Sequence, residues 1–229
     1  MHPGPGFRLR SEWERPPRAV IDGFKEFETP AISDQMNRLY TMEPAIRVLT
    51  DPQARLIGPA LTVKVFPGDN LMVHKSLDIA KPGDVIVVDA GSSTMNAVLG
   101  DLISTKARHR GVAGFIVDGL IRDLPAILEL GDFPVFARDV TPIGPLHRGP
   151  GEIGGAISAG GIVVNPGDVI VADLNGVVVV PRLDVESVLE DVRAKAAGEA
   201  EYVAAVARGE FSNAWVDRFL AENGLDTES

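Results

Sequence analysis

The chain has 229 residues, 45% hydrophobic and 24% charged, so it is long enough to bury a sizeable core. It contains no cysteine, which excludes disulfides, thiolate metal ligands and a cysteine nucleophile. A net charge of −10 without a concentrated basic patch argues against nucleic-acid binding, and no apolar run is long enough to span a membrane. We therefore expect a cytoplasmic protein that binds neither nucleic acid nor membrane.

The first part of the chain predicts an arm, two helices and a strand. Residues 1–18 contain four prolines and lack the apolar segment of a signal peptide, so we expect an extended arm. Residues 22–40 have helical spacing in two pieces, and either Ser33 or Asp34 is placed to cap the second piece. Residues 56–66 alternate as a strand does, and three apolar side chains should share one face: Leu61, Val63 and Val65.

The middle of the chain alternates apolar strands with helical segments, which favours an α/β core. The expected strands are residues 85–89, 114–118 and 133–137, and the expected helices are residues 72–80, 95–110 and 124–130. The first of these strands is apolar up to a terminal aspartate, which is typical of a strand buried on both faces. Asp123 is placed to cap the helix that follows it.

The last third of the chain predicts a β-rich layer and a helical end. Glycines separate short apolar segments, expected to be strands at residues 162–164, 169–172 and 177–180. Residues 183–209 predict an amphipathic helix, and a short helix should follow Phe211. The sequence Pro82-Gly83-Asp84 recurs as Pro166-Gly167-Asp168, each before an apolar run that ends on aspartate, which we interpret as two similar turns in one fold.

The candidate site consists of Gly100-Asp101 and, 20 residues further on, Arg122-Asp123. The first pair is predicted near a helix start and the second at the carboxyl end of a strand, where ligands collect in α/β folds. Two carboxylates without a soft donor suit a hard cation, Mg²⁺ or Mn²⁺, and an arginine offers a two-pronged donor to a carboxylate. Plainer roles stay open: a helix cap at Asp123, a surface ion pair between Arg122 and Asp123, and close packing at Gly100.

Other polar residues give weaker signals. His74, His109 and His147 share no metal-ligand spacing, and we interpret them as surface or capping residues. Lys64 and Lys75 are poor candidates for a Schiff-base lysine, because the chain is too short for the barrel that such an aldolase uses.

A series of turns and strands follows one order along the chain. Its landmarks are Pro67-Gly68-Asp69-Asn70, Pro82-Gly83-Asp84-Val85, Gly100-Asp101, Gly111-Val112-Ala113-Gly114, Val117-Asp118-Gly119, Arg122-Asp123, Phe133-Pro134-Val135-Phe136-Ala137, Asn165-Pro166-Gly167-Asp168 and Gly176-Val177-Val178-Val179-Val180-Pro181. Over roughly residues 30–210 this pattern resembles the RraA-like family, specifically its 4-hydroxy-4-methyl-2-oxoglutarate/4-carboxy-4-hydroxy-2-oxoadipate aldolase branch.

The resemblance implies a class II pyruvate aldolase with an α/β fold of the swivelling β/β/α type. A single layered domain would then span residues 1–229, with an N-terminal arm and helix at residues 1–30 and a C-terminal helical extension at residues 183–229. It also implies a homotrimer or homohexamer with active sites between subunits, and a divalent cation, Mg²⁺ or Mn²⁺.

The resemblance also implies a role for each residue of the candidate site. Asp123 would hold the metal, Asp101 would bind it through water, and Arg122 would contact the keto or carboxylate oxygen of the substrate. The backbone amides of Leu102 and Ile103, directly after Gly100, would bind the pyruvyl carboxylate, as helix N-termini bind anions.

Glu199, in the predicted C-terminal helix, is placed where aldolase relatives supply an acidic group to a neighbouring subunit. A solvated helix face remains an equal interpretation of this glutamate. Leu174-Asn175 depart from the family pattern, which often has Asp-Asp or Asp-Ser there, but they lie away from the candidate site.

The implied reaction cleaves a 4-hydroxy-2-oxo acid and releases pyruvate through a stabilised enolate. Oxaloacetate decarboxylation passes through the same enolate and is expected as well. The alternative is a non-catalytic RraA-type regulator of ribonuclease E. Such regulators are shorter and generally lack the long C-terminal helix, so residues 183–209 favour the aldolase branch.

Overall fold

Parallel strands with apolar residues on both faces form the centre of the fold. The computed structural model describes residues 5–224 and places four strands side by side: β3 (Leu56–Val65), β4 (Val85–Asp89), β6 (Gly114–Ile121) and β7 (Val135–Val140). Neighbours among them are parallel, and every residue of β4 and β6 is buried. The predicted strand at residues 85–89, buried on both faces, is confirmed.

Shorter strands extend this sheet at its edges. They are β1 (Phe7–Leu9) on β8 (Gly151–Ile153), β8 on β3, β2 (Arg47–Val48) on β7, and β5 (Ala97–Leu99) on β6.

The long strand β3 pairs with β4 and β11 as well as with β8. Residues 60–64 pair with β4 in parallel, whereas residues 56–59 pair antiparallel with β11 (Val169–Asp173). Beyond it lie β12 (Gly176–Val180), which pairs with β11, and the separate hairpin of β9 (Ile157–Ala159) and β10 (Ile162–Val164). The predicted β-rich layer is therefore present.

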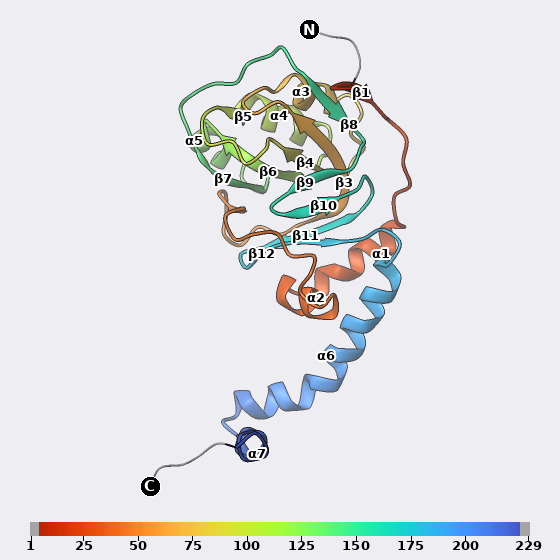
Figure 1. Cartoon of the computed structure of the whole chain (residues 1–229), viewed down its shortest axis with the longest axis vertical. Coiled ribbons are helices and arrows are strands. Elements are labelled where there is room, and N and C mark those ends of the chain that lie inside the picture. The colour runs from red at the N-terminus through yellow and green to blue at the C-terminus, as the bar shows by residue number, and fades with distance from the viewer. Residues whose placement is uncertain (1–4, 225–229) are drawn as a thin grey trace. The chain divides into compact units, whose positions relative to one another are not determined.

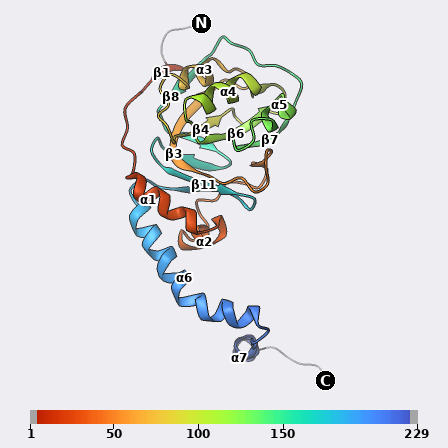
Figure 2. The same cartoon turned by 180° about the vertical axis from the view of Figure 1, so that it is seen from behind.

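Helices flank these strands on both sides. Figures 1 and 2 show three helices together on one side: α3 (Leu71–Ser76), α4 (Asp101–His109) and α5 (Leu124–Leu128). On the other side, next to β11 and β12, are α1 (Arg18–Gly23), the 3-10 turn Phe24–Glu26 and α2 (Thr29–Gln35). This mixed α/β architecture confirms the predicted fold class.

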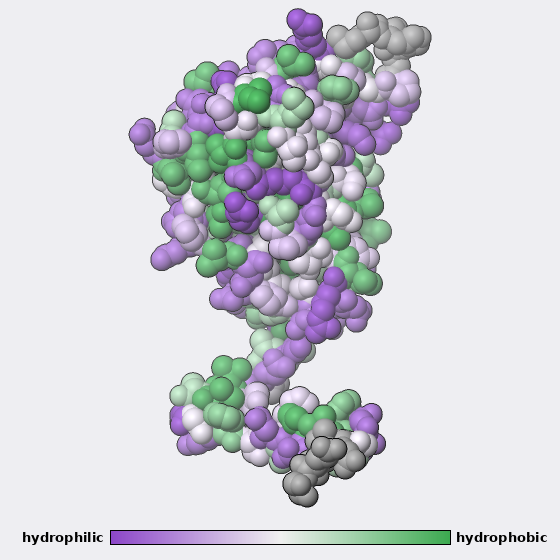
Figure 3. Space-filling view, turned by 60° about the vertical axis from the view of Figure 1, so that its left-hand side comes forward, coloured by the Kyte–Doolittle hydropathy of each residue, from purple (hydrophilic) through white to green (hydrophobic). Residues whose placement is uncertain are grey.

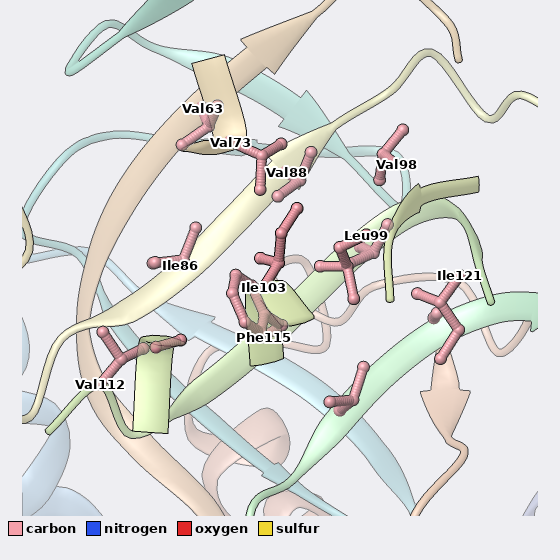
Figure 4. Close-up of a cluster of buried hydrophobic side chains, with 14 of the residues drawn as sticks. Val63, Val73, Ile86, Val88, Val98, Leu99, Ile103, Val112, Phe115 and Ile121 are labelled. Atoms are coloured by element: carbon pink, nitrogen blue, oxygen red, sulfur yellow. The ribbon is translucent and has the colours of Figure 1, made fainter. Parts of the chain in front are cut away.

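One apolar cluster holds α3 and α4 on the sheet. The predicted apolar face of β3 is confirmed, because its three members belong to this cluster: Leu61, Val63 and Val65. Figure 4 shows labelled side chains of the same cluster converging from the helices and the strands: Val73, Ile86, Val88, Ile103 and Phe115. Burying a side chain of the size of Ile103 contributes about 1.5–3 kcal/mol, so this contact helps to hold the first turn of α4 against the sheet.

Residues 1–4 of the predicted N-terminal arm lie outside the described residues, and the part of the arm from residue 7 to residue 17 is extended, as expected. Its guanidinium at Arg15 donates two hydrogen bonds of 2.8 Å to the buried carboxylate of Asp84 and lies 4.5 Å from the ring centroid of Trp13. Asp84 belongs to the turn that starts β4, so the arm is attached to the central sheet.

The two Pro-Gly-Asp turns are alike in the structure. In the first, the carboxylate of Asp84 accepts a hydrogen bond of 2.9 Å from the amide of Lys81. In the second, Asp168 accepts one of 2.7 Å from the amide of Asn165. Each turn closes on its own aspartate and then starts a strand, β4 or β11. The interpretation as two similar turns in one fold is confirmed.

Several predicted helix limits are wrong. Residues 97–99 form a strand rather than helix, because Gly100 is extended (φ −149°, ψ −158°) and α4 can begin only after it. The helix α2 begins at Thr29 with Pro30 in its first turn, a position that suits the fixed φ of proline, so Ser33 and Asp34 lie inside it and do not cap it.

The chain divides into two units, residues 1–190 and 191–229, each described by itself. The helix α6 (Val185–Ala207) includes the boundary, and α7 (Ala214–Glu222) belongs to the second unit, so both predicted C-terminal helices exist. The second unit exposes large apolar and aromatic side chains: Tyr202, Val203, Val206, Phe211, Trp215 and Phe219. Figure 3 shows green, hydrophobic surface on this part of the chain. Within residues 5–224, no helix combines the length and apolar character needed to cross a bilayer.

Candidate functional site

The candidate residues lie at the ends of two paired parallel strands. Leu99, the last residue of β5, is in register with Ile121, the last residue of β6. The amide of Arg122 donates to the carbonyl of Leu99 at 3.0 Å. The residues that follow the strands, Gly100-Asp101 and Arg122-Asp123, therefore leave the sheet side by side. Carboxyl ends of parallel strands are where α/β folds bind ligands.

Gly100 is a glycine because two side chains lie against it. A Cβ atom at this position would be 2.4 Å from Oδ2 of Asp123 and 3.0 Å from Cγ of Arg122. The residue is the N-cap of α4 and not an interior helix position, so it does not serve helix packing. Its missing side chain leaves the space that the carboxylate and the arginine occupy.

Asp123 does not cap α5, and that interpretation is wrong. It stands at the N-cap position with a left-handed backbone (φ 56°, ψ 33°), but its side chain makes no capping hydrogen bond. Oδ2 lies 3.1 Å from Nε of Arg122 instead. Both side chains are about 40% exposed, so this ion pair alone stabilises the fold by well under about 1 kcal/mol. Left-handed non-glycine residues store strain of about 1–3 kcal/mol and concentrate at functional sites.

The start of α4 presents backbone amides beside these side chains. Asp101, Leu102 and Ile103 form the first turn, where helix amides have no partner within the helix. The amide of Ser104 is the first to bond within the helix, to the carbonyl of Gly100 at 3.1 Å. Free amides and the helix dipole together favour an anion at this end.

These residues line one pocket of about 230 Å³ together with others that sequence reasoning did not assign to it. The lining consists of Asn70, His74, Gly100, Asp101, Leu102, Ile103, Arg122, Asp123, Pro145 and His147. Pockets for drug-sized ligands measure about 300–1,000 Å³, so this one suits a smaller molecule. All groups proposed from the sequence, apart from Glu199, are in its lining.

Asn70, His74 and His147 form a wall of the pocket that the sequence did not predict. Nδ1 of His147 lies 2.6 Å from Oδ1 of Asn70, and the two imidazole rings are 6.1 Å apart between centroids. Burial lowers the pKa of His74 below its ordinary value, and the charge of Lys106, together with that of the His147 ring when it is protonated, acts in the same direction. His109, at the far end of α4, is exposed, as expected.

A buried aspartate brings the two loops of this wall together. The carboxylate of Asp69 accepts hydrogen bonds from the amides of Arg148 (2.6 Å) and Gly149 (2.9 Å). The amide of Asn70 donates to the carbonyl of Leu146 at 3.0 Å. The partners are 76 to 80 residues apart in sequence, so no local pattern could have placed His147 beside Asn70.

The oxygen donors of the pocket fit a hard divalent cation. Asp101 and Asp123 are its two carboxylates, and among residues 5–224 no group of three histidine or carboxylate ligands exists. Zinc sites need three or four protein ligands, whereas Mg²⁺ is bound through one or two carboxylates and keeps several waters. The two carboxylates therefore offer the oxygen ligands that Mg²⁺ or Mn²⁺ prefers.

Glu199 belongs to the second unit and is described there. Its side chain is 57% exposed, and Oε1 lies 3.9 Å from Nζ of Lys195 on the next turn of α6. Its contribution to the site of a neighbouring subunit stays a prediction.

Comparison with known proteins identifies the family of this chain. The sequence profile of the RraA-like family, described as Aldolase/RraA, matches residues 29–179, which include the whole pocket. The chain belongs to the RraA-like family. A relative from Halalkalibacterium halodurans, named "Putative 4-hydroxy-4-methyl-2-oxoglutarate aldolase", is 41% identical over 179 residues, which cover 78% of this chain and 84% of the relative.

Solved structures of other proteins share the fold. A Pseudomonas syringae protein described as uncharacterized superposes with a TM-score of 0.77 at 26% identity, covering 87% of this chain and 97% of that one. A Streptomyces coelicolor protein described as an unusual member of the RNase ES inhibitor RraA family has a TM-score of 0.75 at 28% identity, covering 83% of this chain and 98% of that one.

Proposed function

We propose that this RraA-like protein is a divalent-metal-dependent lyase that cleaves a 4-hydroxy-2-oxo acid, such as 4-hydroxy-4-methyl-2-oxoglutarate, and releases pyruvate. The name of the Halalkalibacterium halodurans relative supports this substrate class. One observation carries the proposal: the Asp123 carboxylate and the Arg122 side chain meet over Gly100, in the pocket that also contains Asp101.

Each pocket residue that the sequence analysis assigned to the site has a role in this proposal. Asp123 holds the cation, Mg²⁺ or Mn²⁺, and Asp101 holds it through water. The bound cation supplies positive charge that polarises the C2 carbonyl and favours the enolate. Arg122 donates hydrogen bonds to the keto or carboxylate oxygen, and the amides of Leu102 and Ile103 bind the pyruvyl carboxylate at the start of α4.

The reaction needs a place for the negative charge that develops on the pyruvyl half. When the C3–C4 bond breaks, its electrons pass to C3 and the C2 oxygen, and protonation at C3 then gives pyruvate. Arg122 and the helix amides are donors already in position for that charge, which is how preorganised sites lower a barrier. Oxaloacetate loses carbon dioxide through the same enolate, so its decarboxylation is a second expected activity.

The proposal includes a homotrimer or homohexamer with sites between subunits. Apolar side chains adjoin the pocket and are unusually exposed: Leu71 (36%), Leu102 (65%) and Leu146 (51%). A second copy of the chain that covers this surface would explain why these leucines are exposed. In such an assembly Glu199 of one copy would contribute to the site of its neighbour. Light scattering on the eluting protein measures the assembly.

The test is pyruvate release, coupled to lactate dehydrogenase, from oxaloacetate and from 4-hydroxy-4-methyl-2-oxoglutarate. We expect turnover of both that disappears with EDTA and returns with Mg²⁺ or Mn²⁺. Asp123→Asn should remove the metal-dependent rate, and Arg122→Ala should raise KM for both substrates. Folded, metal-supplied protein that releases no pyruvate from either compound would overturn the proposal.

A second candidate function is inhibition of a ribonuclease without catalysis. The description of the Streptomyces coelicolor structure as a member of the RNase ES inhibitor RraA family favours it. Adding the protein to a ribonuclease E cleavage assay tests it. Inhibition by protein that releases no pyruvate would replace the lyase proposal with this one.

A further inference from the structure

The wall formed by Asn70, His74 and His147 has no role in the function proposed above, although it lines the same pocket as Asp101 and Asp123. It is also firmly built. Asn70 is 2% exposed, and the hydrogen bonds from the amides of Arg148 and Gly149 to Asp69 hold the loop that carries His147. Because these polar side chains line the same small pocket as the charged groups, we expect them to bind a polar group of the substrate.

The hydrogen bond of His147 fixes which ring nitrogen carries the proton. Its Nδ1 faces Oδ1 of Asn70 at 2.6 Å, and an amide oxygen can only accept. Nδ1–H is therefore the donor, and in the neutral ring Nε2 is left as an acceptor with a free lone pair. An acceptor nitrogen binds a hydroxyl group and does not bind a carboxylate, which has no proton to donate at neutral pH.

A 4-hydroxy-2-oxo acid offers one hydroxyl group, on C4. In the proposed function the pyruvyl half lies at the start of α4 with Arg122, so C4 and its substituents extend toward the remainder of the pocket lining. That remainder is the wall that carries His147. The acceptor nitrogen and the hydroxyl are then the complementary pair.

Resting on the proposed function, we propose that His147 is a catalytic base that binds the C4 hydroxyl of the substrate and removes its proton as the C3–C4 bond breaks. Asn70 is the positioning residue that holds the ring in the required tautomer. His74, the neighbouring ring whose pKa burial lowers, adds an uncharged group and no competing cation beside it.

The step balances without any further reactant. The proton on the C4 oxygen moves to Nε2 of His147, and the electrons of the O–H bond form the C4 carbonyl. The electrons of the C3–C4 bond pass to C3 and the C2 oxygen as the enolate. The enolate takes a proton at C3, and His147 gives its proton to C3 or to water, which restores the neutral ring. The products are pyruvate and the carbonyl compound that contained C4.

Comparing the two expected reactions distinguishes the role of His147 as a base from the stabilisation of the enolate by the other residues of the site. Oxaloacetate has no C4 hydroxyl, so its decarboxylation requires enolate stabilisation but no base at that position. His147→Gln should therefore lower kcat for cleavage of 4-hydroxy-4-methyl-2-oxoglutarate by about 100- to 10,000-fold, the usual range for a general base. Decarboxylation of oxaloacetate by the same variant should stay within about twofold of the wild-type rate, on the same principle.

Two further variants complete the experiment. His109→Gln makes the same chemical change at an exposed site on the far end of α4 and should leave both reactions unchanged. His147→Ala opens space at the wall, and added imidazole should restore part of its cleavage rate without altering decarboxylation. Rescue by imidazole is a result that a merely structural histidine does not give.

The outcomes are distinct. An equal loss of both reactions in His147→Gln, or unchanged cleavage, overturns the assignment to His147. Selective loss of cleavage in His74→Gln rather than in His147→Gln overturns it too. If wild-type protein performs neither reaction, the lyase proposal itself fails, and the assignment of His147 fails with it.

Discussion

A single methyl group at position 100 should disable the pocket while leaving the fold intact. In Gly100→Ala the new Cβ would lie 2.4 Å from Oδ2 of Asp123, whereas Cβ atoms in real structures essentially never come closer than 3.0 Å and usually keep 3.4 Å. The carboxylate must therefore move by about 0.6–1.0 Å. Displacements of about 1 Å at catalytic groups cost roughly 100-fold in rate, so kcat/KM for pyruvate release should fall by about that factor.

The same substitution should cost little stability. The atom that must move furthest is the carboxylate oxygen at the end of the half-exposed Asp123 side chain, and Cγ of the half-exposed Arg122, at 3.0 Å, needs a smaller shift. Alanine is a poorer N-cap than glycine, which adds a loss of about 1 kcal/mol at the start of α4. Denaturant unfolding followed by circular dichroism should thus show a loss of about 1 kcal/mol in the free energy of unfolding.

A matched control distinguishes the displacement of the Asp123 carboxylate from the general effect of replacing a glycine by alanine. Gly155 has nothing within 4 Å of its would-be Cβ and no left-handed backbone, so Gly155→Ala should keep full activity. Steady-state assays with both substrates and a Mg²⁺ titration compare the two variants. If Gly100→Ala turned over at the wild-type rate, the carboxylate over Gly100 would not be part of the reaction, and the reasoning would be refuted.

Two predictions concern the stability of the fold. Arg15→Ala leaves the carboxylate of Asp84, which is 1% exposed, without its charged partner, and should cost about 3–5 kcal/mol in denaturant unfolding; a loss below about 1 kcal/mol would contradict the buried pair. Asp173→Asn should cost about 2 kcal/mol at pH 7, because it removes the charge that accepts from the amide (2.8 Å) and hydroxyl (2.7 Å) of Thr29. Burial opposes ionisation of Asp173, but bonds from Thr29 and Asn175 outweigh it and hold its pKa below the ordinary 3.8. The stabilisation is therefore complete above about pH 3.8 and is lost as pH falls through the lower folded value. Thermal melts from pH 2 to 7 should show the wild-type advantage shrinking at the acid end, and a constant difference would refute the linkage.

The central strands could be predicted from sequence because burial on both faces leaves a direct trace in composition. The run Val85–Asp89 is apolar for four residues and cannot alternate, and it is buried at every position. The candidate site could be located through the order of the landmarks that resemble the RraA-like family, and through Arg122-Asp123, which follows a predicted strand. Gly100-Asp101 was expected inside a helix, and its position at the end of β5 depends on the pairing of that strand with β6.

What sequence could not supply are features decided by contacts over long distances. The small residues of 97–104 mimic a helix-packing stripe, yet Ala97–Leu99 is a strand because it pairs with β6. The left-handed backbone of Asp123 leaves no trace in local propensity, so the residue was expected to cap α5. The histidine wall depends on Asp69, whose partners lie about 80 residues later in the chain.

The pairing of β3 with both β4 and β11 also has a consequence for folding during synthesis. Residues 56–59 of β3 wait for β11, which emerges from the ribosome about 110 residues later. At synthesis rates of about 5–20 residues per second, that part of the strand stays without its partner for roughly 5–20 s. Nascent chains must therefore hold an open strand edge until the hairpin of β11 and β12 arrives, and that arrival completes the second apolar cluster.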